Sequence, residues 1–398
     1  MCRTVDHRSA TVGVEEEFHI VDLASRRLTG RADRLLGQLP GDSFSPELPR
    51  SVLEANSRPW VGLLPLAEDL AGLRRTAIAA AGSQGLGIVA AGTVPLADPD
   101  AAQVTADARY ERIGWEYRAL VREQLICGTH VHVGVDDRDL AVAIARRVAP
   151  WLPVLLALSV SSPFWRGTDT GYASWRSLIW RRWPTAGGWF GFASAADYDL
   201  TVAGLIRSGV ITDPGMIYFD VRPSAHLPTL ELRICDSSPL VQDVVLLAGL
   251  FRALVLSAAA AESEGRPLPP VRPELVAAAT WRAAQSGLHG DLVDPLSATA
   301  VPAGRLVGQL LTELRPALEA TGDWELVCEL TRSALARGSS AARQRAAHAR
   351  GGLPAVVDAL LAETRAVPRW LRGGHIARRG STVRARCAMS EQRGVVGQ

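Results

Sequence analysis

The sequence predicts an α+β protein, with an antiparallel sheet drawn from the first two thirds of the chain and helices packed on its outer face. Two observations support this class. Short segments with strand-like patterns dominate up to residue 234, whereas segments with helical spacing follow almost without interruption from residue 240. The strands also do not alternate regularly with helices, as they would in a protein built from βαβ units.

The expected strands share short apolar or alternating patterns. Residues 11–21 (TVGVEEEFHIV) alternate roughly between apolar and polar side chains, as a half-buried strand does. The last two expected strands are separated by a turn at residues 223–228, which proline bounds on both sides. The remaining expected strands are 51–60, 87–91, 125–135, 216–221 and 229–234.

The expected helices carry apolar residues at three- and four-residue spacing. Residues 66–81 end at Gly82, which is typical of a helix C-terminus. Residues 162–192 are crowded with tryptophan, glycine, proline and arginine and lack a clear period, so we expect a long ordered loop there. The other expected helices are 109–124, 139–159, 240–263, 273–285, 302–321, 323–338, 341–349 and 353–364.

Length and composition indicate a globular enzyme. The chain has 398 residues, of which 47% are hydrophobic and 21% charged, and this balance excludes a wholly disordered protein. We expect one domain over residues 1–371. Residues 372–398 are arginine-rich with little apolar content, and we expect them to form a disordered basic tail.

Charge and targeting signals give the expected surroundings. The formal net charge of +2 provides no strong attraction to nucleic acid or to an anionic membrane, so we expect neither as a partner. No apolar run reaches the roughly 20 residues that span a bilayer, and the N-terminal residues do not resemble a secretion signal. We therefore expect a cytoplasmic protein with small-molecule partners, and a homo-oligomer is compatible with the sequence.

Cysteine and lysine usage excludes several kinds of site. The five cysteines are scattered without zinc-finger or redox spacing, so neither a disulfide framework nor a cysteine-bound metal is expected. The chain contains no lysine, and all 43 of its basic residues are arginine. This excludes a P-loop, whose lysine reaches the nucleotide phosphates, and it excludes Schiff-base chemistry. Arginine remains suitable as a phosphate clamp.

Three expected strands each carry two polar side chains two residues apart. Residues at positions i and i+2 of a strand project from the same face. Each pair lies among small or apolar residues, so both members should project from a largely buried strand, where unpaired charge is costly. The pairs are Glu15 with Glu17, His130 with His132, and Glu231 with Arg233.

These pairs favour an oxygen-rich site for a divalent metal. Carboxylates with occasional imidazole suit Mg²⁺ or Mn²⁺, which would bridge to nucleotide phosphates, and Arg233 beside Glu231 could neutralise charge on a transferred phosphoryl group. Any one pair could be a solvated strand face or a pair of satisfied histidines. Zinc is the alternative for the two histidines. We expect Glu16 on the opposite face with a structural or surface role, whereas His19 shares the face of Glu15 and is a weaker candidate.

Several motifs resemble the glutamate–cysteine ligase type 2 family, in particular its YbdK-type carboxylate–amine ligase branch. The resemblance extends from about residue 11 to residue 345. It rests on an ordered set of segments: GVEEEFHIVD, the Leu53-Glu54 pair, AAGTVP, CGTHVHVGV, SSPFWRGTDTGYASWRSLIWRRWPTAG, ITDPGMIYFDVRPSAHLPTLELRICDSSP and GSSAARQR.

The resemblance implies a glutamine synthetase-like fold with a curved antiparallel sheet. It also implies that ATP phosphorylates a carboxylate to an acyl phosphate, which an amine then attacks, with glutamate–cysteine ligase activity giving γ-glutamylcysteine, ADP and phosphate. Residues that match the family's motifs take roles as follows: Glu15, Glu17, Glu231 and His130 as metal ligands, Arg233 and Glu54 as catalytic residues, His132 and Arg222 near the nucleotide, and Arg176 near the substrate.

Other functions stay open on the sequence alone. A phosphotransferase of the same fold would stop at the phosphorylated product, and a non-catalytic relative would only bind metal or nucleotide. A metal-dependent hydrolase using the two histidines is a further alternative. The late GSSAARQR segment lacks an acidic residue expected before its arginine, so this element could bind differently. If the ligase interpretation holds, replacing Glu15 or Glu231 with glutamine should abolish turnover with little unfolding.

Overall fold

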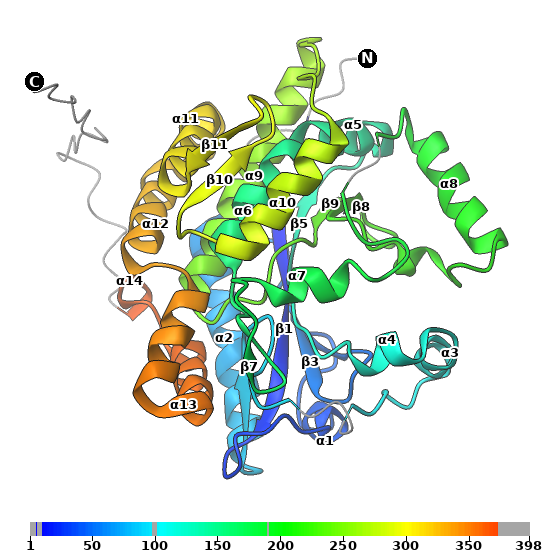
Figure 1. The fold of residues 1–398 in the computed structure, drawn as a ribbon. Coiled ribbons are helices and arrows are strands. Elements are labelled where there is room, and N and C mark those ends of the chain that lie inside the picture. The colour runs from blue at the N-terminus through cyan, green and yellow to red at the C-terminus, as the bar shows by residue number, and fades with distance from the viewer. Residues whose placement is uncertain (1–4, 6–9, 98–101, 189–190, 373–398) are drawn as a thin grey trace, which may run out of the picture.

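The computed structural model describes residue 5 and residues 10–97, 102–188 and 191–372. Seven strands form an antiparallel sheet in the order β2-β3-β1-β5-β9-β8, and β4 pairs with the C-terminal end of β1 (Figure 1). The bounds are β1 Val12–Asp22, β2 Phe44–Pro46, β3 Val52–Asn56, β4 Leu86–Val89, β5 Thr129–Gly134, β8 Val221–Pro223 and β9 Thr229–Leu232.

The central strand β1 separates an apolar face of the sheet from a polar one. Val12, Val14 and Phe18 are buried on one face, while Glu15 and Glu17 project from the other. This alternation lets the same strand contribute to the hydrophobic core and to a polar site. The antiparallel sheet predicted from the sequence is therefore confirmed.

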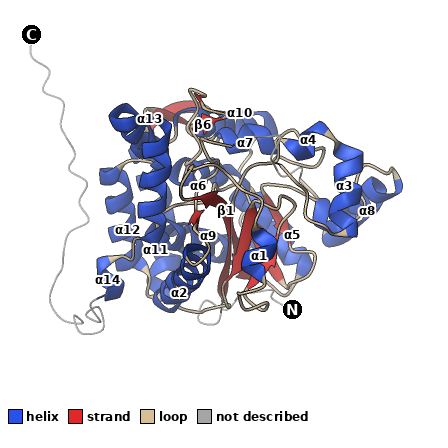
Figure 2. Cartoon of the chain, turned by 90° about the horizontal axis from the view of Figure 1, so that it is seen from below, coloured by secondary structure: helices blue, strands red, loops and turns tan. Residues whose placement is uncertain are grey.

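Helices cover the apolar face of the sheet, as Figure 2 shows from below the view of Figure 1. The helices α2 (Leu63–Gly82), α5 (Arg138–Val148) and α9 (Val241–Ser263) pack there against the strands and against one another. Glu16 of β1 is fully buried on this face and pairs with Arg74 of α2, whose Nη2 lies 2.5 Å from Oε1 of Glu16. The expectation that Glu16 points away from the polar face is confirmed, and its role is structural.

The C-terminal third is helical, as the periodicity predicts. The kink between two expected helices occurs at Gly351 and Gly352, which have non-helical backbone angles inside α13. A small hairpin, β10 (Asp291–Asp294) with β11 (Thr299–Pro302), precedes this region's longer helices. The helices are α10 Pro273–Ser286, α11 Ala303–Thr321, α12 Trp324–Arg337, α13 Ser340–Arg365 and α14 Arg369–Arg372.

Two expected helices are interrupted in the structure. Residues 109–124 form α3 (Ala108–Tyr117) and α4 (Ala119–Arg122), because Arg118 adopts a positive φ of 49° that ends the first helix. Residues 139–159 form α5 and α6 (Leu152–Ser159), which are joined by the 3₁₀ turn η2 (Ala149–Trp151). Proline lies in the first turn of η2 and of α6, where its missing N–H costs little.

Three further expectations need correction. The strand expected at residues 216–221 begins only at Val221, after the 3₁₀ turn η3 (Pro214–Met216). The expected loop at 162–192 contains the helix α7 (Trp175–Trp180) and a short hairpin of β6 (Phe164–Trp165) and β7 (Thr168–Asp169). The further elements that the sequence analysis did not predict are α1 (Ala32–Leu36), β2, α8 (Ala195–Arg207), β10, β11 and α14.

Two helical stretches are long and apolar enough to span a membrane by length and composition, contrary to the expectation from apolar runs. They are residues 138–159 and α9, and 72% and 89% of their most apolar windows are buried inside the protein. This burial is typical of core helices in a globular protein. The expected basic tail, residues 372–398, falls almost wholly outside the described residues.

Candidate functional site

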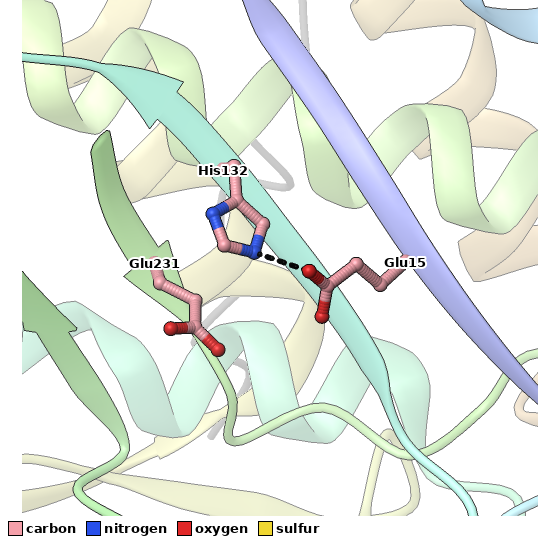
Figure 3. A group of neighbouring side chains, drawn as sticks. All are labelled: Glu15, His132 and Glu231. Atoms are coloured by element: carbon pink, nitrogen blue, oxygen red, sulfur yellow. Dashed lines mark ion pairs between the residues drawn. The ribbon is translucent and has the colours of Figure 1, made fainter. Parts of the chain in front are cut away.

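Strands β1, β5 and β9 bring four of the predicted side chains together on the polar face. Glu15 lies directly opposite His130, and His132 lies directly opposite Glu231. Residues directly opposite in an antiparallel pair project from the same face, which explains why the separate sequence pairs converge. Figure 3 shows Glu15, His132 and Glu231 facing one another, with Nε2 of His132 3.1 Å from Oε1 of Glu15.

The other carboxylate oxygen of Glu15 contacts the second histidine. Nδ1 of His130 lies 3.1 Å from Oε2 of Glu15, so one carboxylate bridges both imidazoles. His132 is fixed further by Thr229, whose Oγ1 lies 2.9 Å from its Nδ1. Nε2 of His130 is buried and has no hydrogen-bond partner among the described residues. This nitrogen lies 3.9 Å from Oε1 of Glu17, so it is placed to bind a metal ion together with the carboxylates.

Strands β2 and β3 add a second acidic group beside the first. Glu17 lies opposite Glu54, and Ser45 of β2 donates a hydrogen bond of 2.8 Å to Oε1 of Glu54. Glu47, just after β2, offers a carboxylate oxygen within 4.8 Å of ligand atoms of Glu17 and Glu54. The sequence analysis missed Glu47. The signal that could have revealed it is the Ser45–Glu47 alternation, which is obscured because the strand has only three residues and ends at Pro46.

Two carboxyl groups of the site, Glu47 and Glu54, have raised pKa values, and two others, Glu15 and Glu231, have lowered ones. Burial raises the pKa of Glu47 to about 7, reinforced by the charge of Glu17. Burial also raises the pKa of Glu54 well above its usual value, with the charge of Glu15 adding to it. Burial opposes ionisation of Glu15 too, but hydrogen bonds from the two histidines outweigh it and hold the pKa of Glu15 well below its usual value.

Glu231 is ionised because two arginines face it. Burial acts to raise its pKa, but the charges of Arg222 and then Arg233 outweigh burial and lower the pKa far below its usual value. Nε of Arg222 lies 2.8 Å from Oε2 of Glu231, and Nη1 of Arg233 donates to Oε1. The structure thus brings Arg222, Arg233 and Glu231 together, whereas the sequence analysis paired only Glu231 with Arg233. Glu231 therefore already has two cationic partners, and a bound metal ion would share its carboxylate with them.

The remaining predicted residue, Arg176, lies in α7 on the polar side of the sheet. Its side chain is buried and donates to the backbone oxygens of Arg233 and Ile234 at 3.3 Å. It packs against Gly128 so closely that a Cβ there would lie 2.3 Å from Nη2 of Arg176. Arg176 therefore lines the site but already hydrogen-bonds the strand backbone. His19 is fully buried, and burial lowers its pKa to about 4.

A cavity of about 190 Å³ lies over this face. Its lining includes four carboxylates and His130, together with the aromatic rings of Tyr110, Trp180, Trp183 and Tyr218. Trp180 lies under the guanidinium groups of both Arg176 and Arg233, 5.6 and 5.7 Å from its ring centre. The cavity lining therefore combines carboxylates, aromatic rings and arginines. His132 and Glu231 lie in the adjoining cluster instead of in the cavity lining.

The donor set fits divalent cations that prefer oxygen. Three groups of side chains each place ligand atoms within 4.8 Å of one another. Their crowded carboxylates, two of them with raised pKa values, are the arrangement that a bound cation would relieve. Oxygen donors with a few imidazoles match Mg²⁺ or Mn²⁺. The groups are Glu15, His132 and Glu231; Glu15, Glu54 and His130; and Glu17, Glu47 and Glu54.

Comparisons with known proteins point to one family. A family model described as glutamate–cysteine ligase family 2 matches residues 11–359. A Frankia casuarinae protein provisionally named glutamate–cysteine ligase 2-2 is 59% identical over 364 residues, which cover 91% of this chain and 42% of the relative. A Mycolicibacterium smegmatis protein with the same provisional name is 53% identical over 89% of this chain and 90% of its own length.

A solved structure shows the same fold at low identity. The glutamate–cysteine ligase of Francisella tularensis in complex with AMP superposes with a TM-score of 0.68 at 13% identity, over 93% of this chain and 92% of that one. The predicted α+β, glutamine synthetase-like fold is thereby confirmed. The chain spans less than half the length of the Frankia relative and nearly the whole of the Mycolicibacterium one.

Proposed function

The chain belongs to glutamate–cysteine ligase family 2, and on this basis we propose that it is an ATP-dependent carboxylate–amine ligase. The reaction would proceed through an acyl phosphate and give an amide, ADP and phosphate, with L-glutamate and L-cysteine as the first substrates to test and γ-glutamylcysteine as their product. The observation that carries the proposal is the convergence of carboxylates, histidines and arginines from neighbouring strands on one cavity and on the cluster beside it that holds His132 and Glu231.

The proposed metal ligands are the acidic residues and one histidine. Glu15, Glu17, Glu231 and His130 are retained from the sequence analysis, and Glu47 is added because of its place beside Glu17. Bound Mg²⁺ or Mn²⁺ would offset the negative charge of the ATP phosphates and the substrate carboxylate as they approach. This fits a site whose carboxylates already repel one another.

The arginines would stabilise the charge that moves during the two chemical steps. In the first step a carboxylate oxygen of the acid bonds to the γ-phosphorus of ATP, and the bond to ADP breaks. In the second, the amine nitrogen attacks the acyl carbon and phosphate leaves. Arg233 and Arg222 both contact the carboxylate of Glu231. Their guanidinium groups are suited to binding phosphoryl oxygens.

Proton transfer and positioning fall to the other residues. The amine must lose a proton when it forms the amide, and the carboxylate of Glu54 is our candidate acceptor once a bound cation lowers its raised pKa and ionises it. His132 would contact the nucleotide phosphates from its place beside Glu15. Arg176 would support the substrate side of the cavity through the backbone of the strand end that bears Arg233. We place the protein in the cytoplasm, where ATP and free amino acids are available.

A screen of paired substrates tests this proposal. Purified protein with Mg²⁺ and ATP should release ADP only when both a carboxylic acid and an amine are present, and mass spectrometry should find the amide. If no pair in a broad panel of amino acids and amines promotes ADP release although ATP binds, the ligase proposal fails. A stable phosphorylated acid without any amide would favour the phosphotransferase instead.

A further inference from the structure

Arg109 differs from the other arginines of the cavity in what holds its guanidinium group. The others are held by buried groups of the sheet, as described above. Arg109 lies in the first turn of α3 and donates to the carboxylate of Asp213, with Nε 2.8 Å from Oδ2 and Nη2 3.1 Å from Oδ1. This two-point contact is the geometry in which arginine binds a carboxylate.

The Arg109–Asp213 pair is open to solvent and therefore exchangeable. The side chains of Arg109 and Asp213 are 42% and 32% exposed. Exposed ion pairs contribute little to stability, so a carboxylate from a ligand can replace Asp213 at low cost. The buried pairs deeper in the site lack this property, because removing one partner would leave an unpaired charge without water.

Arg109 also lies where a substrate would pass. Arg109 lines the cavity together with Tyr110, Tyr218 and Gly215. Gly215 is packed so closely that a Cβ there would lie 2.8 Å from Oδ1 of Asp213 and 3.2 Å from Nη2 of Arg109. The guanidinium of Arg109, which already binds one carboxylate, thus belongs to a residue that lines the cavity that would hold the reacting groups, whereas Asp213 lies beside that lining.

We propose that Arg109 is a specificity-determining residue that binds the carboxylate an amino-acid substrate keeps through the reaction. Asp213 is then the internal carboxylate that the substrate displaces. The proposal rests on the proposed ligase function, because it concerns a substrate of that site. The carboxylate could belong to the acid donor or to the amine acceptor, and the experiment separates the two.

Binding titrations with matched ligands test the assignment. Calorimetry with Mg²⁺ and a non-hydrolysable ATP analogue compares L-glutamate with isoglutamine, which lacks a free α-carboxylate, and L-cysteine with cysteamine, which lacks the carboxylate altogether. We expect Arg109→Met to weaken binding of one of the two amino acids on the order of tenfold. Binding of the analogue without the carboxylate should be the same in Arg109→Met as in the wild type. The amino acid affected identifies the donor or the acceptor.

Two further variants distinguish substrate binding from a structural clamp. Asp213→Asn should bind the same amino acid at least as tightly as the wild type, because it frees Arg109. The control Arg138→Met removes another exposed ion pair, to Asp199 at 2.6 Å between α5 and α8, which does not line the cavity, and should leave binding unchanged.

Four results would overturn the assignment. Asp213→Asn could weaken binding as Arg109→Met does, which would make the pair a clamp. Arg109→Met could weaken the matched analogues equally, or leave both amino acids unaffected. The wild type could bind neither amino acid. None of these results touches the ligase proposal, which stands or falls on ADP release with any acid and amine in the substrate screen.

Discussion

Glu47 and Glu15 show at the scale of single residues how one wall of the site holds carboxylates in different states. Glu15 accepts from two imidazoles, whereas Glu47 has burial and the charge of Glu17 acting on it. Some of the carboxyl groups of the site are therefore protonated when no metal is bound. A bound cation would favour their ionised form, so metal binding should release protons.

The pH dependence of stability tests this state of Glu47. Its pKa is raised from 4.5 to about 7, so the folded form keeps a proton that the unfolded chain gives up. Its stabilising contribution is present below pH 4.5 and is lost as the pH rises to about 7, a loss on the order of 2 kcal/mol after allowance for partial exposure. Thermal unfolding of metal-free protein should show this decline, and Mg²⁺ should offset it at the upper end.

Glu47→Gln is the matched variant for this prediction. It cannot ionise, so the decline between about pH 5 and about pH 7 should flatten while Mg²⁺ binds more weakly. Ser45→Ala serves as a control, because it removes a hydrogen bond to Glu54 without removing a charge. A wild type and a Glu47→Gln variant with parallel pH profiles would show that Glu47 is ionised in the metal-free protein.

Glu231 behaves differently, and the structure changes what its substitution should do. Glu231→Gln should abolish turnover, as expected from the sequence, but it would also leave the guanidinium groups of Arg222 and Arg233 buried without a counter-ion. Since the pKa of Glu231 is lowered, its contribution to stability is present above the unfolded pKa and is lost as the pH falls. We predict a loss of about 3 kcal/mol in urea unfolding at neutral pH.

Glu15→Gln is the comparison for this loss of stability. Its imidazole partners can become neutral, so its effect on unfolding should be smaller while turnover is also lost. Equal stability of the Glu231→Gln variant and the wild type at neutral pH would contradict the two-arginine arrangement.

At the scale of elements, the strands that carry the site were the easiest part to predict. Short apolar or alternating patterns identified β1, β5 and β9, and side chains two residues apart had to share a face. The pairing of those strands could not be read from the pattern, because register depends on contacts between distant segments. Glu47 was not predicted as a site residue because β2 has only three residues. The helix break at Arg118 was not predicted because no sequence signal marks its φ of 49°.

Gly128 provides the element-scale prediction, because the approach of α7 to β5 depends on its missing side chain. A Cβ at this position would lie 2.3 Å from Nη2 of Arg176, so Gly128→Ala should displace that guanidinium and lower activity by an order of magnitude or more. Gly13→Ala is the control for folding, since nothing lies closer than 3.9 Å to its Cβ. Kinetics and near-ultraviolet circular dichroism of the nearby tryptophans would report the change. Unchanged activity in Gly128→Ala would exclude a role for the position of Arg176.

At the scale of the whole molecule, one face of the sheet forms the hydrophobic core and the other face carries the candidate site. Its apolar face is covered by α2, α5 and α9, and its polar face holds the site beneath segments that include α3, α7 and η3. The segments over the site come from parts of the chain far apart in sequence. This explains why the fold class was predictable from periodicity while the cavity, which needs all of these segments in place, was not.

Transfer of oxygen from the acid to phosphate is the most direct test of the proposed chemistry. The acid found in the substrate screen, labelled with ¹⁸O in its reacting carboxylate, would be incubated with ATP, Mg²⁺ and the amine, and the products weighed by mass spectrometry. An acyl phosphate predicts one ¹⁸O atom in the released phosphate for each amide formed, with ADP as the nucleotide product. Label in AMP, or amide without label in phosphate, would contradict the account.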